Sequence, residues 1–281
     1  MIRYIACLLL CSFLPLPTVA EDSTPRAVYI ANMGVMIERG ETKIVFDPLF
    51  NNDYGIYEPV PANTRAALLA GIGPWNGIDA IFISHHHGDH FDPGTVLELL
   101  RTQQSMELFG PEQAAAAIRE QVADPEDPVL QRIHGLSLEN GKAATDITLG
   151  PLLVEAARIR HSGWPDRHAD VENIVFRVTL DSETTVMHFG DADPADAHFA
   201  QSPEHWSERQ SHFAMPPYWF FLSDQGRQVL KDRIRANAVI GMHVPTSVPD
   251  ERARRREKLQ DVDLFTKPGE TRTLPVSSHS H

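Results

Sequence analysis

One short segment constrains the fold and chemistry of this chain more than any other. The apolar residues 78–83 are followed by Ser-His-His-His-Gly-Asp-His at residues 84–90, which carry four imidazoles and one carboxylate. Alternate side chains of an extended segment share a side, so His85 and His87 point together, and a turn at Gly88 returns the last two polar groups to the same cavity. Because unpartnered polar groups are costly to bury and imidazole and carboxylate are preferred Zn²⁺ ligands, the segment predicts a metal site rather than a solvated turn.

Three apolar segments in the second half of the chain each lead to one further potential ligand. Any one of these side chains alone would be better explained as a hydrogen-bonded core residue. Their repetition beside the histidine-rich loop favours metal binding instead. They are His161 after residues 152–160, Asp191 after residues 185–190, and His243 after residues 239–242.

The histidine-rich loop resembles the His-x-His-x-Asp-His signature of the metallo-β-lactamase superfamily, and the resemblance extends from about residue 27 to residue 245. It implies an α/β fold, a four-layer αββα sandwich that holds one or two metal ions at the edges of its sheets. It also implies a ligand set, with His85, His87 and His161 on a first ion, Asp89, His90 and His243 on a second, and Asp191 bridging both.

Two features at the bridging carboxylate depart from the family pattern. The usual Gly-Asp-Thr is Gly190-Asp191-Ala192 here, so a hydroxyl is absent. His188 adds an imidazole nearby, which we interpret as a core residue rather than a ligand.

The opening of the chain resembles the branch that includes ascorbate-phosphate lactonase and N-acyl phosphatidylethanolamine phospholipase D. The resemblance rests on strands predicted at residues 27–30, 35–38 and 43–46, followed by Asp47 and Pro48. Asp47 has two interpretations, a hydrogen-bond partner of a ligand histidine or a simple strand-ending turn.

The ligand set predicts a hydrolase with two divalent metal ions, and we expect these to be Zn²⁺. Two ions that share Asp191 can activate a shared water as hydroxide, and Asp89 can orient it, which makes Asp89 the predicted catalytic residue. We expect a small-molecule substrate with an ester, lactone, amide or phosphodiester bond. One alternative is a periplasmic metallo-β-lactamase, whose three-histidine subclass does not need Asp191. The other is a metal-binding or sensing module without turnover, which would not need Asp89.

Five aromatic side chains are candidates to line a substrate cleft, with packing over the core as the alternative for each. They lie in the loop-rich residues 51–77 and in an aromatic segment between two ligand segments, and are Tyr54, Tyr57, Trp75, Tyr218 and Trp219. Elsewhere we expect helices at residues 64–70, 95–101, 111–123, 226–236 and 250–259, and strands at residues 108–109, 152–159, 173–180 and 185–189. Residues 124–141 are charged and turn-rich.

Composition limits the class of partner. The 281 residues carry a formal net charge of −13, which argues against nucleic acid as the partner because that partner requires a basic face. Both cysteines, Cys7 and Cys11, lie in the first twenty residues, so a processed chain would hold no disulfide or thiolate ligand. Oligomeric state is not predicted. We expect one hydrolase domain at residues 21–266 and a disordered tail at residues 267–281.

Residues 1–20 predict a secretory signal peptide, with Arg3 before an apolar centre and small residues at its end. The apolar run is shorter than the roughly 20 residues that span a bilayer, so we expect cleavage near Ala20, a periplasmic or secreted protein, and no stable membrane insertion. Amino-terminal sequencing of the exported protein should therefore begin near Glu21, and recovery of only a full-length cytoplasmic product would contradict this expectation.

Overall fold

Two β-sheets pack face to face in the computed structural model, which describes residues 24–181, 184–248 and 256–275. Within these residues the first sheet has the strand order β13-β1-β2-β3-β4-β5-β6 and the second has the order β12-β11-β10-β9-β8-β7. The strands of the first sheet are β1 (Arg26–Ala31), β2 (Gly34–Arg39), β3 (Thr42–Phe46), β4 (Ala80–Phe82), β5 (Glu107–Pro111), β6 (Ile133–Leu136) and β13 (Thr271–Thr273). Those of the second are β7 (Ala143–Leu149), β8 (Leu152–Arg158), β9 (Ile174–Thr179), β10 (Thr185–His188), β11 (Phe213–Met215) and β12 (Ala238–Val239).

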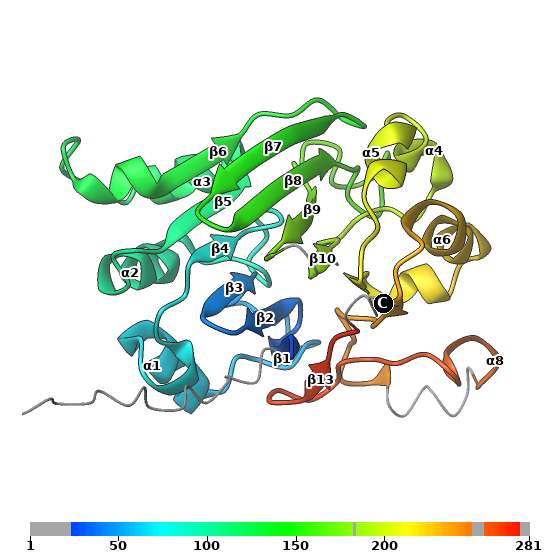
Figure 1. Ribbon diagram of the computed structural model, residues 1–281, viewed down its shortest axis with the longest axis horizontal. Helices are drawn as coiled ribbons and strands as arrows, with labels where there is room; N and C mark the ends of the chain where they lie inside the picture. Colours follow the sequence, from blue (N-terminus) through cyan, green and yellow to red (C-terminus); the bar gives the residue numbers. More distant parts are fainter. Residues whose placement is uncertain (1–23, 182–183, 249–255, 276–281) are drawn as a thin grey trace, which may run out of the picture.

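Helices cover the outer faces of the two sheets. In Figure 1 the helices α1, α2 and α3 lie on one side of the sheets and α4, α5 and α6 lie on the other. The resulting four layers agree with the predicted αββα sandwich. The helical segments are α1 (Ala62–Ala70), η1 (Gly73–Trp75), α2 (Pro93–Thr102), α3 (Glu112–Arg119), η2 (Pro128–Arg132), α4 (Asp196–Phe199), α5 (Pro203–Glu208), η3 (Tyr218–Phe221), α6 (Asp224–Val229), the π-helical η4 (Leu230–Ile234) and α8 (Arg256–Leu259).

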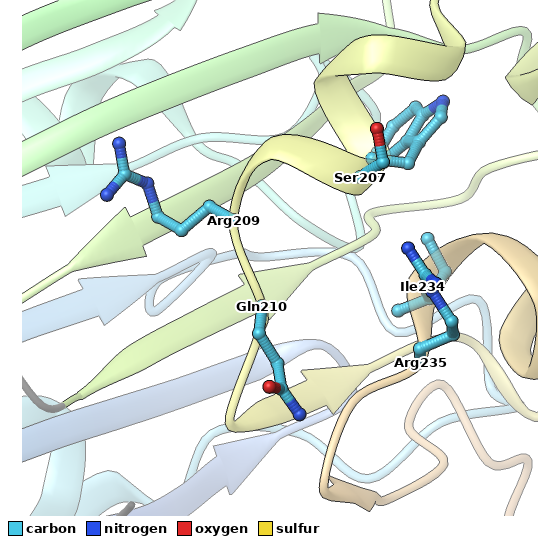
Figure 2. Close-up of a pocket in the computed structure, with 6 residues that line it drawn as sticks. Ser207, Arg209, Gln210, Ile234 and Arg235 are labelled. Carbon is cyan, nitrogen blue, oxygen red and sulfur yellow. The ribbon is translucent and has the colours of Figure 1, made fainter.

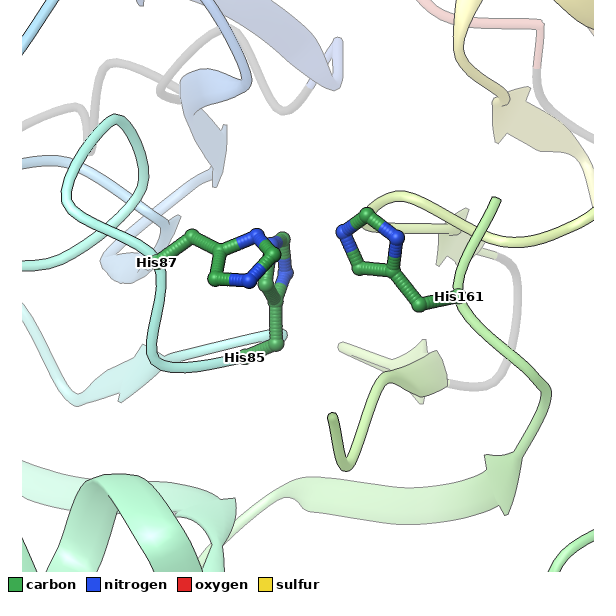
Figure 3. A group of neighbouring side chains, drawn as sticks. All are labelled: His85, His87 and His161. Carbon is green, nitrogen blue, oxygen red and sulfur yellow. The ribbon is translucent and has the colours of Figure 1, made fainter. Parts of the chain in front are cut away.

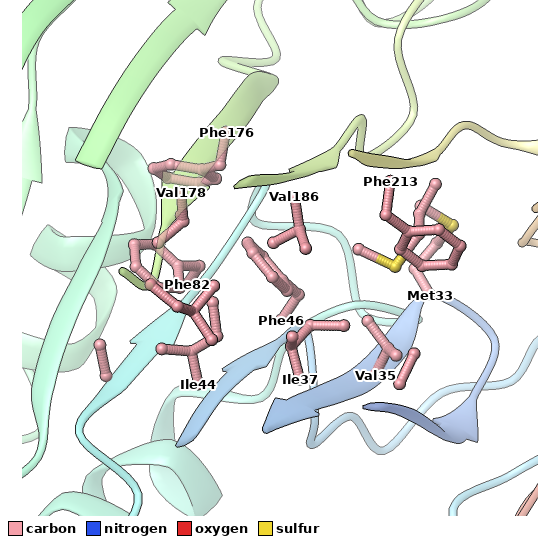
Figure 4. Close-up of a cluster of buried hydrophobic side chains, with 14 of the residues drawn as sticks. Met33, Val35, Ile37, Ile44, Phe46, Phe82, Phe176, Val178, Val186 and Phe213 are labelled. Carbon is pink, nitrogen blue, oxygen red and sulfur yellow. The ribbon is translucent and has the colours of Figure 1, made fainter. Parts of the chain in front are cut away.

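The layers follow from the alternation of side chains along each strand. In β3, Ile44 and Phe46 belong to the core between the sheets, while Val45 belongs to the core beneath the helices. Strand β11 does the same, with Phe213 facing inward and Ala214 outward. Because both faces of these strands are buried, they read in sequence as continuous apolar runs. Figure 4 shows the inner core, where side chains from both sheets interdigitate.

One buried ion pair lies on the outer face of the second sheet. Arg177 of β9 is 1% exposed and donates from Nε to Glu155 Oε2 of β8 over 2.8 Å, and Arg209 Nε donates to the same oxygen over 3.0 Å. Leaving either charge buried without its partner commonly costs about 3–5 kcal/mol. The buried charge of Arg177 on this otherwise apolar face of β9 is therefore compensated by Glu155.

The helix predicted at residues 95–101 is α2, which begins two residues earlier, at Pro93. Asp92 precedes the helix and accepts a hydrogen bond from Thr95 N at 2.8 Å, and Pro93 occupies the first turn, where its missing N–H is not needed. The predicted helix at residues 226–236 is α6 continued by the π-helical turn η4.

Several elements differ from the expectations. The turn-rich residues 124–141 contain η2 and β6, and β7 and β11 were not predicted. A disordered tail from residue 267 is wrong for residues 271–273, because β13 pairs with β1 in the register Arg26↔Thr273. Strands β6, β11 and β13 have only three or four residues, too few to show alternation, and pairing with a neighbouring strand defines them.

Some expectations lie outside the described residues. The predicted signal peptide falls entirely there, as does most of the predicted basic helix at residues 250–259, of which α8 describes the end. Among the helices of the described segments, none combines the length and apolarity needed to cross a membrane.

Candidate metal centre

The seven predicted ligands come together where loops leave the two sheets. Residues 84–90 follow β4, while His161, Asp191 and His243 follow β8, β10 and β12. Two hydrogen bonds hold these loops in place: Ile174 N, at the start of β9, donates to Ser84 O over 2.9 Å, and Ser162 N donates to Asp191 O over 2.7 Å. The site therefore lies at one edge of the sandwich, between the sheets.

Gly190 permits the close approach of these loops. Its φ is +52°, a left-handed conformation that costs glycine little. A side chain at this position would collide with Asn173 and Ser84.

The ligand side chains form overlapping groups of three. In each group, one ligand atom from every residue lies within 4.8 Å of the others. Figure 3 shows the first group, with His161 directed toward the paired His85 and His87. The groups are His85 with His87 and His161, His85 with His90 and Asp191, and Asp89 with His90 and His243.

Hydrogen bonds orient the histidines of the first group toward a shared centre. His85 Nδ1 lies 3.0 Å from Ser84 Oγ, and His161 Nδ1 lies 2.8 Å from the Ser162 carbonyl oxygen, to which it donates. The other ring nitrogens, His85 Nε2 and His161 Nε2, are buried and have no hydrogen-bond partner in the parts of the chain described. Buried nitrogens that lack a protein partner and converge on one point fit a metal ion, whose ligand histidines are commonly held through their second nitrogen.

The second group is linked to the first by the carboxylate of Asp191. Asp191 Oδ2 lies 3.4 Å from His161 Nε2, and Asp191 Oδ1 lies 3.2 Å from both His90 Nε2 and His243 Nε2. Asp89 Oδ2 lies 3.2 Å from His243 Nε2. The two oxygens of Asp191 thus face different groups, which is the arrangement of a bridging carboxylate.

Each of these side chains changes the pKa of its neighbours. Burial opposes ionisation of the carboxylates, but His243 and His90 outweigh it, so the pKa of Asp191 lies well below its usual value and that of Asp89 is also lowered. Burial likewise opposes protonation of His90 and His243, but the charges of Asp191 and Asp89 raise the pKa of both rings. The two buried carboxylates therefore favour positive charge around them. Protonated imidazoles can supply this charge, and divalent ions can supply it in their place.

The first group has the opposite electrostatics. Burial, together with neighbouring imidazoles, lowers the pKa of His85 well below its usual value. Burial and His161 lower the pKa of His87 to about 4. Both rings are neutral near pH 7 and present the lone pairs that a metal requires.

Asp47 takes the first of its two predicted roles. It is fully buried at the end of β3, and its Oδ2 accepts hydrogen bonds from His90 Nδ1 at 2.9 Å and from Ser84 Oγ at 2.5 Å. Its Oδ1 accepts from Ser84 N at 2.7 Å. One carboxylate therefore orients His90 and, through Ser84, also His85.

Asn32 was not identified from the sequence. It lies in the turn between β1 and β2 with φ +48°, is fully buried, and donates from Nδ2 to the Asp89 carbonyl oxygen at 2.9 Å and to Asp89 Oδ2 at 3.3 Å. Its own carbonyl oxygen accepts from His243 N at 3.2 Å. The sequence did offer one signal for Asn32: it is a polar residue in the turn of an otherwise apolar hairpin.

Two further residues next to the centre were also missed. Asn173 Oδ1 accepts from Asp191 N at 2.8 Å, and so fixes the backbone of the bridging carboxylate. His168 has a left-handed φ of +58°, and its ring centroid lies 4.6 Å from that of His161 and 4.9 Å from that of His87. Non-glycine residues in this conformation cluster at functional sites.

Four of the five aromatic candidates lie near the centre or the metal loop, and one does not. Tyr57 and Trp219 contact His243, with ring centroids 4.3 Å and 5.2 Å away, and Tyr218 packs edge-on against Trp219. Tyr54 is 53% exposed beside the metal loop. Trp75 takes the packing alternative, because it is buried in the core beneath α1 and α2 and does not face the centre.

His188 agrees with its interpretation as a core residue. It is fully buried, its Nε2 lies 3.0 Å from the Met33 carbonyl oxygen, and its ring stacks on Phe46.

A separate cavity of about 270 Å³ lies between α5 and η4 (Figure 2). Several polar groups around it are already paired: Gln210 donates to Asn237 and Arg209 to Glu155. None of its lining residues belongs to the ligand groups. This cavity therefore contributes nothing to the chemistry of the metal centre.

Comparison with protein families supports the resemblance seen in the sequence. A family model described as "Beta-lactamase superfamily domain" matches residues 42–205, more than half of the chain. The matched segment contains every predicted ligand except His243. No curated protein sequence matches the chain.

Solved structures confirm the predicted fold class. A possible metal-dependent hydrolase from Veillonella parvula is 14% identical, with a TM-score of 0.61, and the match covers 89% of this chain and 100% of that one. The metallo-beta-lactamase fold protein YhfI from Bacillus subtilis is 15% identical, with a TM-score of 0.56 and coverage of 89% and 99%. CmlA, a diiron β-hydroxylase from Streptomyces venezuelae, is 14% identical, with a TM-score of 0.50 and coverage of 90% and 54%. At these identities the likeness establishes the fold alone.

The contacts of Asp47 generate a test of the centre's outer hydrogen bonds. Asp47→Asn replaces the acceptor of His90 and Ser84 with a group that donates, so His90 loses its orientation and zinc affinity should fall by about 10-fold to 100-fold. Competition with a chelator measures this affinity. Asp127→Asn, on the surface beside η2, is the control and should leave it unchanged. Equal affinities for Asp47→Asn and the unaltered protein would contradict the role of Asp47.

Proposed function

This chain belongs to the beta-lactamase superfamily, and from that membership we propose that it is an exported hydrolase that works with two divalent metal ions, expected to be zinc. One observation carries the proposal above the others. Asp191 turns one oxygen toward His161 of the first ligand group and the other toward His90 and His243 of the second. A carboxylate shared in this way is the geometry required to hold two ions close enough to act on one substrate.

The donor set fits such ions. The first site would be held by His85, His87 and His161, the second by Asp89, His90 and His243, with Asp191 between them. Bound divalent ions would supply Lewis-acid chemistry, lowering the pKa of a water molecule and polarising the scissile carbonyl or phosphoryl oxygen.

The protein's own residues position the reaction. Asn32 and His243 hold Oδ2 of Asp89 from two sides, at 3.3 Å and 3.2 Å, so the carboxylate has a fixed direction. From that position Asp89 can accept a proton from the attacking water. Three other residues hold the predicted ligands in place: Asp47 contacts His90, Ser84 contacts His85, and Asn173 contacts the backbone of Asp191.

The proposed substrate is a small molecule with a carboxylic ester, lactone, amide or phosphodiester bond. Aromatic rings beside His243 provide an apolar wall on one side of the centre. The closer likeness to the lactonase and phospholipase D branch is part of the proposal, as is export, which rests on residues 1–20 alone. The name of the neighbour from Veillonella parvula, a possible metal-dependent hydrolase, supports hydrolysis in this fold, and CmlA, a diiron enzyme, is a reason to measure the metal directly.

A hydrolysis screen distinguishes the candidate substrates and functions. Zinc-loaded mature protein would be assayed on lactones, thioesters, β-lactams and bis(p-nitrophenyl) phosphate. Turnover confined to β-lactams would favour a metallo-β-lactamase. Tight metal binding with no turnover on any of these classes would favour a binding or sensing module.

Asp89→Asn separates catalysis from simple metal binding. The substitution keeps the shape of the side chain but weakens its hold on the second ion and its capacity to take a proton. We therefore expect kcat to fall by about 100-fold or more on the substrate that the screen identifies.

Asp92→Asn is the matched control for this experiment. It lies three positions along the chain and caps α2, and asparagine caps helices as well as aspartate does. Its kcat should stay within about twofold of the unaltered value, a modest margin compared with the loss at an acid–base group. Unchanged turnover in Asp89→Asn would exclude Asp89 as the residue that positions the nucleophile.

A further inference from the structure

We propose that Tyr57 is a catalytic residue whose hydroxyl donates a hydrogen bond to the oxyanion that develops on the substrate. The inference rests on the proposed function and adds a group outside the metal-ligand set. It follows from how the loop that carries Tyr57 is tied down and from what its side chain contacts.

The loop at residues 52–57 is fixed to the centre at both of its ends. Asn52 N donates to the carbonyl oxygen of Gly88, in the metal loop, over 3.1 Å. At the other end, Thr246 donates to the Ile56 carbonyl oxygen from N over 2.9 Å and from Oγ1 over 3.0 Å, and Thr246 lies three residues after His243. The loop therefore spans the centre from the metal loop to the His243 loop.

The turn within this loop is also internally fixed. Tyr57 N donates to the Asp53 carbonyl oxygen over 3.1 Å, and Gly55 N donates to Asp53 Oδ1 over 2.8 Å. Tyr54 and Gly55 have positive φ values of 51° and 65°, which produce the sharp reversal. Such a constrained backbone is suited to holding one side chain in a set position.

The ring of Tyr57 lies edge-on against the ring of His243, with 4.3 Å between centroids and 84° between planes. His243 Nε2 in turn lies 3.2 Å from both Asp89 Oδ2 and Asp191 Oδ1. Tyr57 is thus one ring away from the ligand atoms of the second group.

The hydroxyl of Tyr57 has no hydrogen-bond partner within residues 24–181, 184–248 and 256–275. The side chain is only partly exposed, and tyrosine hydroxyls that are largely buried usually find a partner. A tyrosine hydroxyl ordinarily loses its proton only at about pH 10, so the group is an O–H donor at neutral pH. A donor without an acceptor beside a metal centre is available to a substrate.

The neighbouring aromatic side chains are less suited to this role. Trp219 already donates its indole N–H to the Ala192 carbonyl oxygen at 3.1 Å. Tyr54 is 53% exposed, and its hydroxyl lies beside Gly88 of the metal loop rather than against the ring of a predicted ligand. Tyr57 therefore combines a fixed ring, a position beside the second ligand group and an available donor.

The test measures binding of oxyanion mimics to the zinc-loaded mature protein by calorimetry. Inorganic phosphate represents a phosphoryl oxyanion, and phenylboronic acid, which becomes a tetrahedral boronate, represents an acyl one. Tyr57→Phe keeps the ring against His243 and removes only the hydroxyl. Tyr54→Phe removes the hydroxyl of the more exposed tyrosine of the same loop, which does not contact His243, and is the matched control.

We expect Tyr57→Phe to weaken binding of at least one mimic by about 10-fold to 100-fold, as hydrogen bonds to charged groups are commonly worth that much. The mimic that is affected identifies the class of oxyanion. Tyr54→Phe should bind both as the unaltered protein does, and all three proteins should hold equal zinc.

Three outcomes would overturn the role of Tyr57. These are unchanged affinities in Tyr57→Phe, failure of both mimics to bind the unaltered zinc-loaded protein, or loss of zinc from Tyr57→Phe, which would make Tyr57 a support of the metal centre. A failure of the proposed function is distinguishable, because it would appear as an unaltered protein that takes up no zinc or shows no turnover in the substrate screen.

Discussion

Two carboxylates buried in one cavity impose the requirement that the rest of the structure satisfies. Asp89 and Asp191 are nearly inaccessible to solvent, and two such charges are tolerated only where positive charge and hydrogen bonds surround them. Imidazoles surround both carboxylates, and two divalent ions held by the same residues would supply the remaining positive charge. A further layer of hydrogen bonds holds these groups in place. Asp47 and Ser84 orient the histidines, and Asn32 and Asn173 hold the two aspartates.

The sandwich brings these groups together because its strands end at one edge. Buried alternation fixes which face of β4, β8 and β10 meets the other sheet, and so fixes where each following loop begins. The loops are then joined directly by hydrogen bonds, such as the one that Ser162 N donates to Asp191 O. Precision at the centre thus comes from two sheets that cannot slide without exposing their cores, together with the short contacts between loops.

Most of the side chains that converge at the candidate centre could be predicted from sequence, and most of the residues that hold them in place could not. The spacing of residues 84–90 is specific by itself, and the repeated apolar segments before His161, Asp191 and His243 extend it. The role of Asn32 could not be predicted, because its hydrogen bond to Asp89 joins it to the loop at residues 84–90, which is distant in sequence. Trp75 and Tyr57 were equivalent in sequence, and only the packing of α1 and α2 buries one while the loop contacts of Ile56 place the other beside His243.

The central claim is that this centre holds two metal ions, and metal content tests it most directly. Elemental analysis should be made on gently purified protein cut after residue 275, which retains β13 and removes the histidines at 279 and 281. The account predicts about two divalent ions per chain, mostly zinc. No more than trace metal in a folded protein that also fails to take up added zinc would contradict both the site and the mechanism built on it.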